Sequence, residues 1–130
     1  MPTIYGAPVS PFVRKVRAYM KERGLAYELT PVMPGSDDPA FRKISPLGKI
    51  PAYVEGDFAI SDSSVILSYL ESTANGKGLL TGDPKQDARA WWFDEYADSK
   101  SFDVLISKIF FARVVGPKYF NLPLDETAIR

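Results

Sequence analysis

Short apolar stretches alternate with polar residues over the first eighty positions, and turn-forming residues interrupt them often. Residues 2–6 predict a first strand, and residues 12–23 predict an amphipathic helix because their apolar side chains recur at helical spacing. A Ser-Pro pair precedes this helix and a glycine follows it, which is typical of a helix start and end. Residues 26–33 predict a second strand. The chain therefore opens with a predicted βαβ unit and a parallel pair of strands.

A hairpin and a further helix are predicted in the next forty residues. After a polar loop, residues 40–44 predict a short helix, and two short strands at 51–54 and 58–60 flank a glycine turn. The Ser-Asp-Ser-Ser segment at 61–64 caps a helix predicted over 65–71. The order βαβ and then ββα predicts an α/β domain, a small sheet with helices on its faces.

The last third of the chain predicts mainly helix. Glycines and a proline in residues 75–78 and 82–84 bracket a linker, and one long helix is predicted from Pro84, with Asp83 as its N-cap, to about Val115. Apolar side chains fall on two sides of this helix, so it needs packing partners on both. Uncovered apolar sides favour self-association, and a two-fold dimer is the expected form.

The residues after Val115 are too few to cover both sides, and residues 124–130 resemble the start of another helix. We therefore expect the chain to be cut off inside its second domain. The expected organisation is a first domain at 1–76, a linker at 77–83 and the beginning of an all-helical domain at 84–130.

Composition and charge narrow the possible chemistry. The chain has 16 basic and 16 acidic residues and neither cysteine nor histidine. The charges balance locally, with nine of each sign in residues 1–83 and seven of each in 84–130, so no basic stripe indicates nucleic-acid binding. The missing residue types exclude thiolates of the protein itself, dithiol redox cycles and histidine bases or metal ligands. A hydroxyl, a carboxylate, a lysine, the backbone or a borrowed group remains.

The N-terminus lacks a basic start followed by an apolar core, and the longest apolar runs are too short to span a membrane. A soluble cytoplasmic protein that binds neither membranes nor nucleic acids is the expectation.

Two helix starts contain candidate functional residues. Ser10 is the predicted N-cap of the first helix and follows the first strand, where helix N–H groups favour an anion. Asp62 and Ser63, at the start of the later helix, could bind an α-amino-acid head, with its carboxylate at the N–H groups and its ammonium at Asp62. Ser and Asp at such positions are usually caps, so both sites also have an ordinary structural explanation.

Two further features could bind a peptide. Lys49-Ile50-Pro51 leads into the predicted strand at 51–54, and a proline at the start of a strand is ordinary. A peptide bond before proline, such as Ile50–Pro51, is cis in only about 5–6% of cases. Arg42 and Lys43, together with Lys49, form a cationic group that could hold a carboxylate, although such groups are usually solvated surface charge.

Three stretches in this order resemble the glutathione S-transferase family, in its serine-type, bacterial-like form. They read SPFVRKV from Ser10, SPLGKIPAYV from Ser45 and ISDSSVILSYLE from Ile60. The resemblance covers residues 1 to about 80 closely and continues into the predicted long helix. It implies a thioredoxin-like domain with a mixed four-stranded sheet, followed by the first part of an all-α domain.

The resemblance also implies roles for individual residues. Ile50 would pair its backbone with the cysteinyl part of glutathione beside a cis Pro51, and Lys49 would face a carboxylate of the peptide. Asp62 and Ser63 would hold the γ-glutamyl head. Asp62 stands where many members have glutamate, which shortens the reach to the ligand. Arg14-Lys15 stands where many members have another residue followed by arginine, so the pattern of the first helix is shifted by one position.

By the same resemblance, Ser10 would be the catalytic residue beside the glutathione sulfur. A serine hydroxyl holds its own proton too tightly at pH 7 to act as the base, so Ser10 would donate a hydrogen bond to the thiolate while the thiol proton leaves to water.

The function implied is glutathione S-transferase activity in detoxification: the thiolate of glutathione, a co-substrate, attacks a small apolar electrophile, with no metal. A homodimer is the expected assembly. A non-catalytic transferase-like binding module is the alternative, and a glutaredoxin-like thiol reductase is excluded for conventional chemistry because cysteine is missing.

Overall fold

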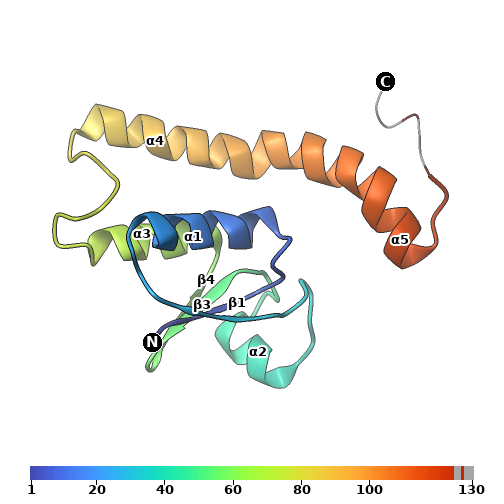
Figure 1. Cartoon of the computed structure of the whole chain (residues 1–130), viewed down its shortest axis with the longest axis horizontal. Helices are drawn as coiled ribbons and strands as arrows, with labels where there is room; N and C mark the ends of the chain where they lie inside the picture. The colour runs from blue at the N-terminus through green and yellow to red at the C-terminus, as the bar shows by residue number, and fades with distance from the viewer. Residues whose placement is uncertain (125–126, 128–130) are drawn as a thin grey trace. The chain divides into compact units, whose positions relative to one another are not determined.

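The computed structural model describes residues 1–124 and 127. The chain divides into two compact units, Met1–Thr81 and Gly82–Arg130. Figure 1 shows a sheet with helices on its faces in the first unit and a long helical rod in the second.

The first unit contains a mixed four-stranded sheet in the order β2-β1-β3-β4. Its strands are β1 (Thr3–Tyr5), β2 (Glu28–Thr30), β3 (Ala52–Glu55) and β4 (Phe58–Ser61). β1 pairs with β2 in parallel and with β3 antiparallel, and β3 and β4 form an antiparallel hairpin. The predicted βαβ unit, its parallel pair and the hairpin are thus confirmed. β2 is shorter than the predicted segment at 26–33, because its ladder with β1 spans three residue pairs.

Three helices accompany the sheet: α1 (Pro11–Glu22), α2 (Pro39–Ile44) and α3 (Ser63–Ser72). The predicted N-caps are present, Ser10 on α1 and Asp62 on α3. In Figure 1, α1 and α3 lie beside each other over the sheet, and α2 lies on the other side of the strands. Both α1 and α3 begin at the same end of the sheet, which brings two helix N-termini together there.

The core lies between the sheet and the pair α1 and α3. The spacing predicted one buried face on α1, and that face is fully buried. The largest buried apolar side chains are Ile4, Val13, Val16, Met20, Tyr53 and Ile66. Each such side chain contributes about 1.5–3 kcal/mol on leaving water, so the core holds both helix starts in fixed positions relative to the sheet.

The second unit begins with α4 (Pro84–Tyr96), capped by Asp83 as predicted. The helix continues through η1 (Ala97–Ser101) and η2 (Asp103–Val115), which have the wider π-helical turn, into α5 (Gly116–Phe120).

The predicted end at about Val115 coincides with the end of η2, but the backbone stays helical beyond it, since Gly116 has φ of −57° and ψ of −56°. α5 follows directly, with Pro117 in its first turn. The helix start predicted over 124–130 lies for the most part outside the described residues. Within residues 1–124 and 127, no helix is both long and apolar enough to cross a membrane.

Candidate functional site

Ser10 is the last residue of the loop between β1 and α1. Its Oγ accepts a hydrogen bond from the Val13 backbone N–H at 3.4 Å, which makes it the N-cap of α1. This distance exceeds the usual 2.7–3.2 Å for such a bond, so the capping contact is weak. In this bond the hydroxyl is the acceptor, and its own proton can be donated to an anion at the helix N-terminus. Capping and anion stabilisation are therefore compatible in the same side chain.

Gly6 brings the same loop against Ile50. A Cβ on Gly6 would lie 2.5 Å from Val13 Cγ2 and 3.2 Å from Ile50 Cβ, so a side chain at this position would force its neighbours apart. Only glycine permits this close approach. The loop that contains Ser10 and the segment that contains Ile50 are therefore neighbours.

The Ile50–Pro51 peptide bond is cis, as the resemblance implied. Pro51 is fully buried, and its carbonyl accepts a hydrogen bond from the Asp62 backbone N–H at 3.2 Å. In the sheet, Ala52 pairs with Tyr5 on one side and with Ser61 on the other. The end of β1, the start of β3 and the end of β4 consequently lie on one edge of the sheet, beside the starts of α1 and α3.

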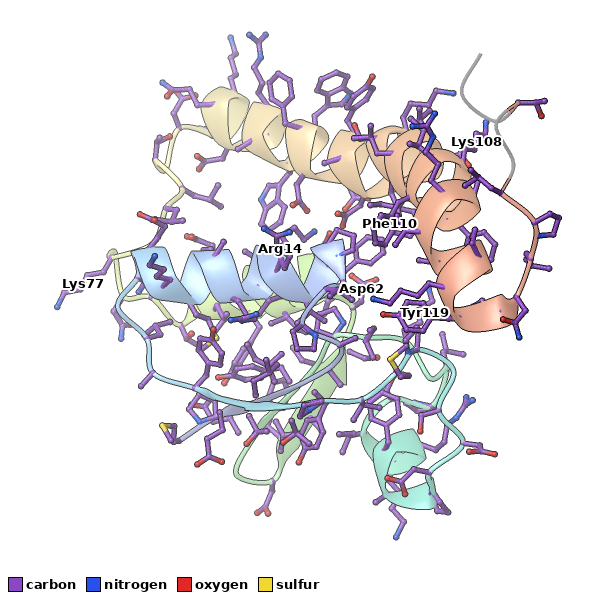
Figure 2. The ribbon with its side chains drawn as sticks, turned by 45° about the vertical axis from the view of Figure 1, so that its right-hand side comes forward. Arg14, Asp62, Lys77, Lys108, Phe110 and Tyr119 are labelled. Carbon is purple, nitrogen blue, oxygen red and sulfur yellow. The ribbon has the colours of Figure 1, made fainter. Side chains whose placement is uncertain are left out.

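Asp62 occupies an uncommon backbone conformation, with φ of 87° and an exposed side chain. Its Oδ1 accepts hydrogen bonds from the backbone N–H groups of Ser64 at 3.1 Å and Val65 at 3.3 Å. Positive φ at a residue other than glycine costs about 1–3 kcal/mol and is concentrated at functional sites. Ser63, next to it, is buried. Figure 2 labels Asp62 at the end of the first unit where α1 begins.

Lys49 lies before the cis bond with its side chain exposed. Its carbonyl accepts a hydrogen bond from the fully buried Ser45 hydroxyl at 2.8 Å, which holds the backbone of this segment. The structure therefore places six predicted residues on loops and at a helix start that meet at one end of the sheet: Ser10, Lys49, Ile50, Pro51, Asp62 and Ser63.

Arg42 is a structural residue, so its predicted part in a carboxylate-binding group is not supported. Its guanidinium donates to the carbonyls of Ser36 at 2.7 Å, Pro46 at 3.1 Å and Gly35 at 3.2 Å. Gly48 has φ of 66°, and a Cβ there would lie 2.8 Å from the guanidinium carbon. Arg42 thus holds together the two loops on either side of α2.

Sequence reasoning missed a contact between the two helix starts. Lys15 on α1 donates from Nζ to Ser64 Oγ on α3 at 3.1 Å. The two residues are 49 positions apart, and neither local spacing nor composition indicates that they meet. The unusual Arg14-Lys15 pair in the first helix was the only signal at this position.

Tyr19 joins α1 and α3 further along the helices. Its hydroxyl donates to Glu71 Oε1 at 2.6 Å and accepts from Arg23 at 2.9 Å. Burial, followed by the hydrogen bond to Glu71, raises the pKa of Tyr19 from 10.0 to about 12. The backbone N–H of Leu79 also donates to Glu71, at 2.6 Å. This network belongs to the scaffold, because it holds the two helices and the segment after α3 together.

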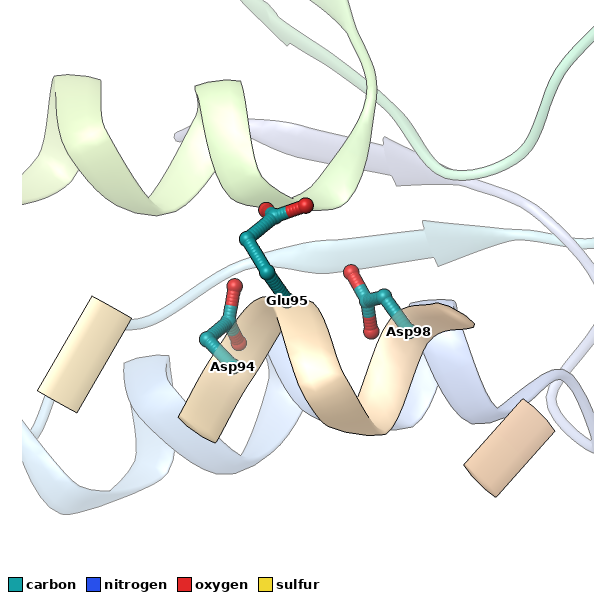
Figure 3. A group of neighbouring side chains, drawn as sticks. All are labelled: Asp94, Glu95 and Asp98. Carbon is teal, nitrogen blue, oxygen red and sulfur yellow. The ribbon is translucent and has the colours of Figure 1, made fainter. Parts of the chain in front are cut away.

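Two other features are formed by residues outside the predicted site. A hollow of about 500 Å³ is lined by α1 residues, including Arg17 and Lys21, and by the segment 24–27; it shares no residue with the predicted site. Asp94, Glu95 and Asp98 lie close together on α4 and η1, with ligand oxygens within 4.8 Å of one another (Figure 3). Acidic groups of this kind are common on helix surfaces without an ion, so the trio alone does not indicate a metal site.

Known proteins match this chain over nearly its whole length. The model of the glutathione S-transferase N-terminal domain matches residues 4–78. A glutathione S-transferase from Hyoscyamus muticus is 33% identical over 132 residues, which cover 97% of this chain and 61% of the relative. The chain thus spans less than two thirds of this relative.

Solved structures agree with the sequence comparison. A glutathione S-transferase from Rhodospirillum rubrum has a TM-score of 0.86 and 26% identity, covering 100% of this chain and 59% of that one. A glutathione S-transferase from Methylobacterium radiotolerans, in complex with glutathione sulfonate, has a TM-score of 0.73 and 28% identity, covering 82% and 51%. The sheet and helices of the first unit and the match over residues 4–78 lead to one conclusion: this chain belongs to the glutathione S-transferase family.

Proposed function

We propose that the protein is a glutathione S-transferase of the serine type, in which the thiolate of bound glutathione attacks a small apolar electrophile. Ser10 is the residue that best supports this proposal. It ends the β1–α1 loop, caps α1 through the Val13 N–H at 3.4 Å and lies at the positive end of the helix.

The energies are sufficient for this role. A free thiol has a pKa of about 8.5, so only about 3% is thiolate at pH 7. Lowering the pKa by about two units requires roughly 2.7 kcal/mol of preferential stabilisation of the thiolate. A hydroxyl donating to an anion contributes about 1.5–3 kcal/mol, and a helix N-terminus contributes about 0.3–1 kcal/mol. One serine at a helix start can therefore provide the required stabilisation.

The remaining predicted residues form subsites for the tripeptide in this proposal. The backbone of Ile50, beside the cis Pro51, pairs with the cysteinyl residue, and Lys49 faces a carboxylate of the peptide. Asp62 binds the ammonium of the γ-glutamyl head. Ser63 binds the head as well, at the start of α3. The common position of these loops at one end of the sheet supports this arrangement.

Glutathione is the proposed co-substrate. The similar chain from Methylobacterium radiotolerans, 28% identical, was solved in complex with glutathione sulfonate. We further propose a bacterial-like member that acts in detoxification in the cytoplasm as a homodimer. Its domain organisation is proposed as 1–76, a linker at 77–83 and a helical domain from 84.

The test is the ultraviolet absorbance of bound thiolate against pH, for wild type, Ser10→Ala and Ser10→Thr. We expect Ser10→Ala to bind glutathione while the pKa of the bound thiol rises toward about 8.5. Turnover at pH 6.5 should fall about 10- to 100-fold, with much less loss at pH 9. Ser10→Thr, which retains a hydroxyl, should resemble the wild type.

Superimposable titrations of the wild type and Ser10→Ala would leave Ser10 as a helix cap and favour the non-catalytic binding module. A wild-type protein that passes through immobilised glutathione without retention would contradict glutathione binding itself.

A further inference from the structure

The start of α3 is already partly occupied by a carboxylate of the protein. Asp62 Oδ1 accepts hydrogen bonds from the N–H groups of Ser64 and Val65, at 3.1 and 3.3 Å. A ligand carboxylate that binds beside Ser63 meets both the helix N-terminus and the negative charge of Asp62. Because two like charges close together repel, a nearby cation would favour a carboxylate here.

Lys15 is a cation that a hydrogen bond places at this helix start. Its Nζ lies 3.1 Å from Ser64 Oγ, in the first turn of α3. The side chain is half-buried between two helices, where a charge is screened less than on an open surface. Its backbone belongs to α1, whose packed face includes Val16 and Tyr19, so the core fixes the backbone from which the side chain extends to Ser64.

Two other cationic side chains, Arg42 and Lys49, belong to other segments of the chain. Arg42 donates to three backbone carbonyls around α2, and the Lys49 side chain is exposed on the segment before β3. Lys15 therefore differs from both in contacting α3 itself.

We propose that Lys15 is a positioning and specificity-determining residue for the γ-glutamyl head of glutathione. Its ammonium, held at Ser64, offsets the charge of Asp62 and favours an α-carboxylate beside Ser63. Asp62 and Lys15 then recognise the two opposite charges of an α-amino-acid head. This inference rests on the proposed glutathione binding and adds a cation to that site.

The test compares two ligands by calorimetry. Glutathione has the α-carboxylate, whereas 4-aminobutanoyl-cysteinyl-glycine keeps the amine and lacks that group. We expect Lys15→Met to weaken glutathione binding about tenfold and to leave the affinity for the analogue unchanged. The loss for glutathione should shrink as salt is raised, because the interaction is between charges. Lys15→Arg should restore most of the glutathione affinity.

Lys21→Met is the matched control, because it removes an exposed lysine from the last turn of the same helix; it should bind both ligands as the wild type does. Lys15→Gln removes the charge but can still donate to Ser64, and it serves if Lys15→Met does not fold.

Equal weakening of both ligands by the Lys15 variants would reduce Lys15 to a structural link between helices and overturn the inference. An unchanged affinity for glutathione would do the same. A wild-type protein that binds neither ligand would instead contradict the proposed function.

Discussion

At the scale of single residues, Asp62 combines two tasks in one carboxylate. One oxygen caps α3 through the N–H groups of Ser64 and Val65, while the side chain stays exposed at the edge where the loops meet. Its backbone has φ of 87°, which Asp and Asn tolerate better than other residues with a side chain. Removing the side chain therefore mixes a capping effect, a backbone effect and a loss of charge.

Substitution of Asp62 by Asn separates these effects. Asn retains a capping oxygen and tolerates positive φ, so Asp62→Asn should keep nearly the wild-type free energy of unfolding. Losing the charge-assisted bond to the γ-glutamyl ammonium should cost about 1.5–3 kcal/mol, roughly 10- to 150-fold in affinity for glutathione. Asp62→Ala should lose a similar amount of affinity and, in addition, about 0.5–2 kcal/mol of stability.

Calorimetric titration and urea unfolding measure the two quantities on the same samples. A folded Asp62→Asn protein with wild-type glutathione affinity would show that Asp62 is only a cap.

At the scale of elements, side-chain hydrogen bonds join α1 and α3 at two positions along their length. Lys15 contacts Ser64 near the helix starts, and Tyr19 contacts Glu71 further along. Glu71 also accepts from the Leu79 N–H, so the segment after α3 is attached to the same pair of helices. These bonds therefore hold the two helix N-termini at the candidate site in a fixed arrangement.

The raised pKa of Tyr19 predicts a loss of stability at alkaline pH. The folded pKa of Tyr19 is about 12 against an ordinary 10.0, so the folded state keeps a proton that the unfolded chain releases between these values. This retained proton adds about 2–3 kcal/mol to the free energy of unfolding. The stabilisation is complete below pH 10 and is lost as the pH rises through 12. Tyr19→Phe, which has no hydroxyl to titrate, should lack this part of the pH dependence.

Urea unfolding at pH 9 and pH 11 measures the effect. We expect the wild type to be more stable than Tyr19→Phe at pH 9 and the difference to narrow at pH 11. The pKa values of Tyr53 and Tyr69 are raised as well, chiefly by burial for Tyr53 and by the hydrogen bond to Glu55 for Tyr69. Both remain in the two proteins and cancel in the comparison. A difference that stays constant with pH would contradict the assignment.

At the scale of the whole molecule, the second unit exposes many large apolar side chains. Trp92 and Phe93 are each 59% exposed, and Leu105 is 57% exposed. Trp92 also stacks on Tyr96 with ring centroids 5.5 Å apart. Aromatic groups of this size in one exposed region favour association between protein molecules.

We expect the chain to self-associate as a two-fold dimer. Light scattering at high concentration should give about twice the 14.5 kDa mass of one chain. Exchange of Trp92 and Phe93 for serine should shift the equilibrium toward the monomer, because it removes apolar area that association would bury. A wild-type monomer at all concentrations would contradict the expectation.

The sequence by itself determined the local structure. The caps Ser10, Asp62 and Asp83 each bond N–H groups two or three positions ahead, and the hairpin closes on a glycine turn. These interactions depend on neighbours in the chain, so spacing is enough to predict them. The order of three motifs then indicated the family and the residues of the candidate site.

The tertiary structure alone decided which distant groups meet. Lys15 contacts Ser64 across 49 positions, and the bare backbone of Gly6 permits Ile50 to approach the Ser10 loop. Arg42, which the sequence left available for a ligand, instead bonds backbone carbonyls of two loops. Such contacts depend on how the core packs α1 and α3 on the sheet, and packing against distant partners is not encoded in local spacing.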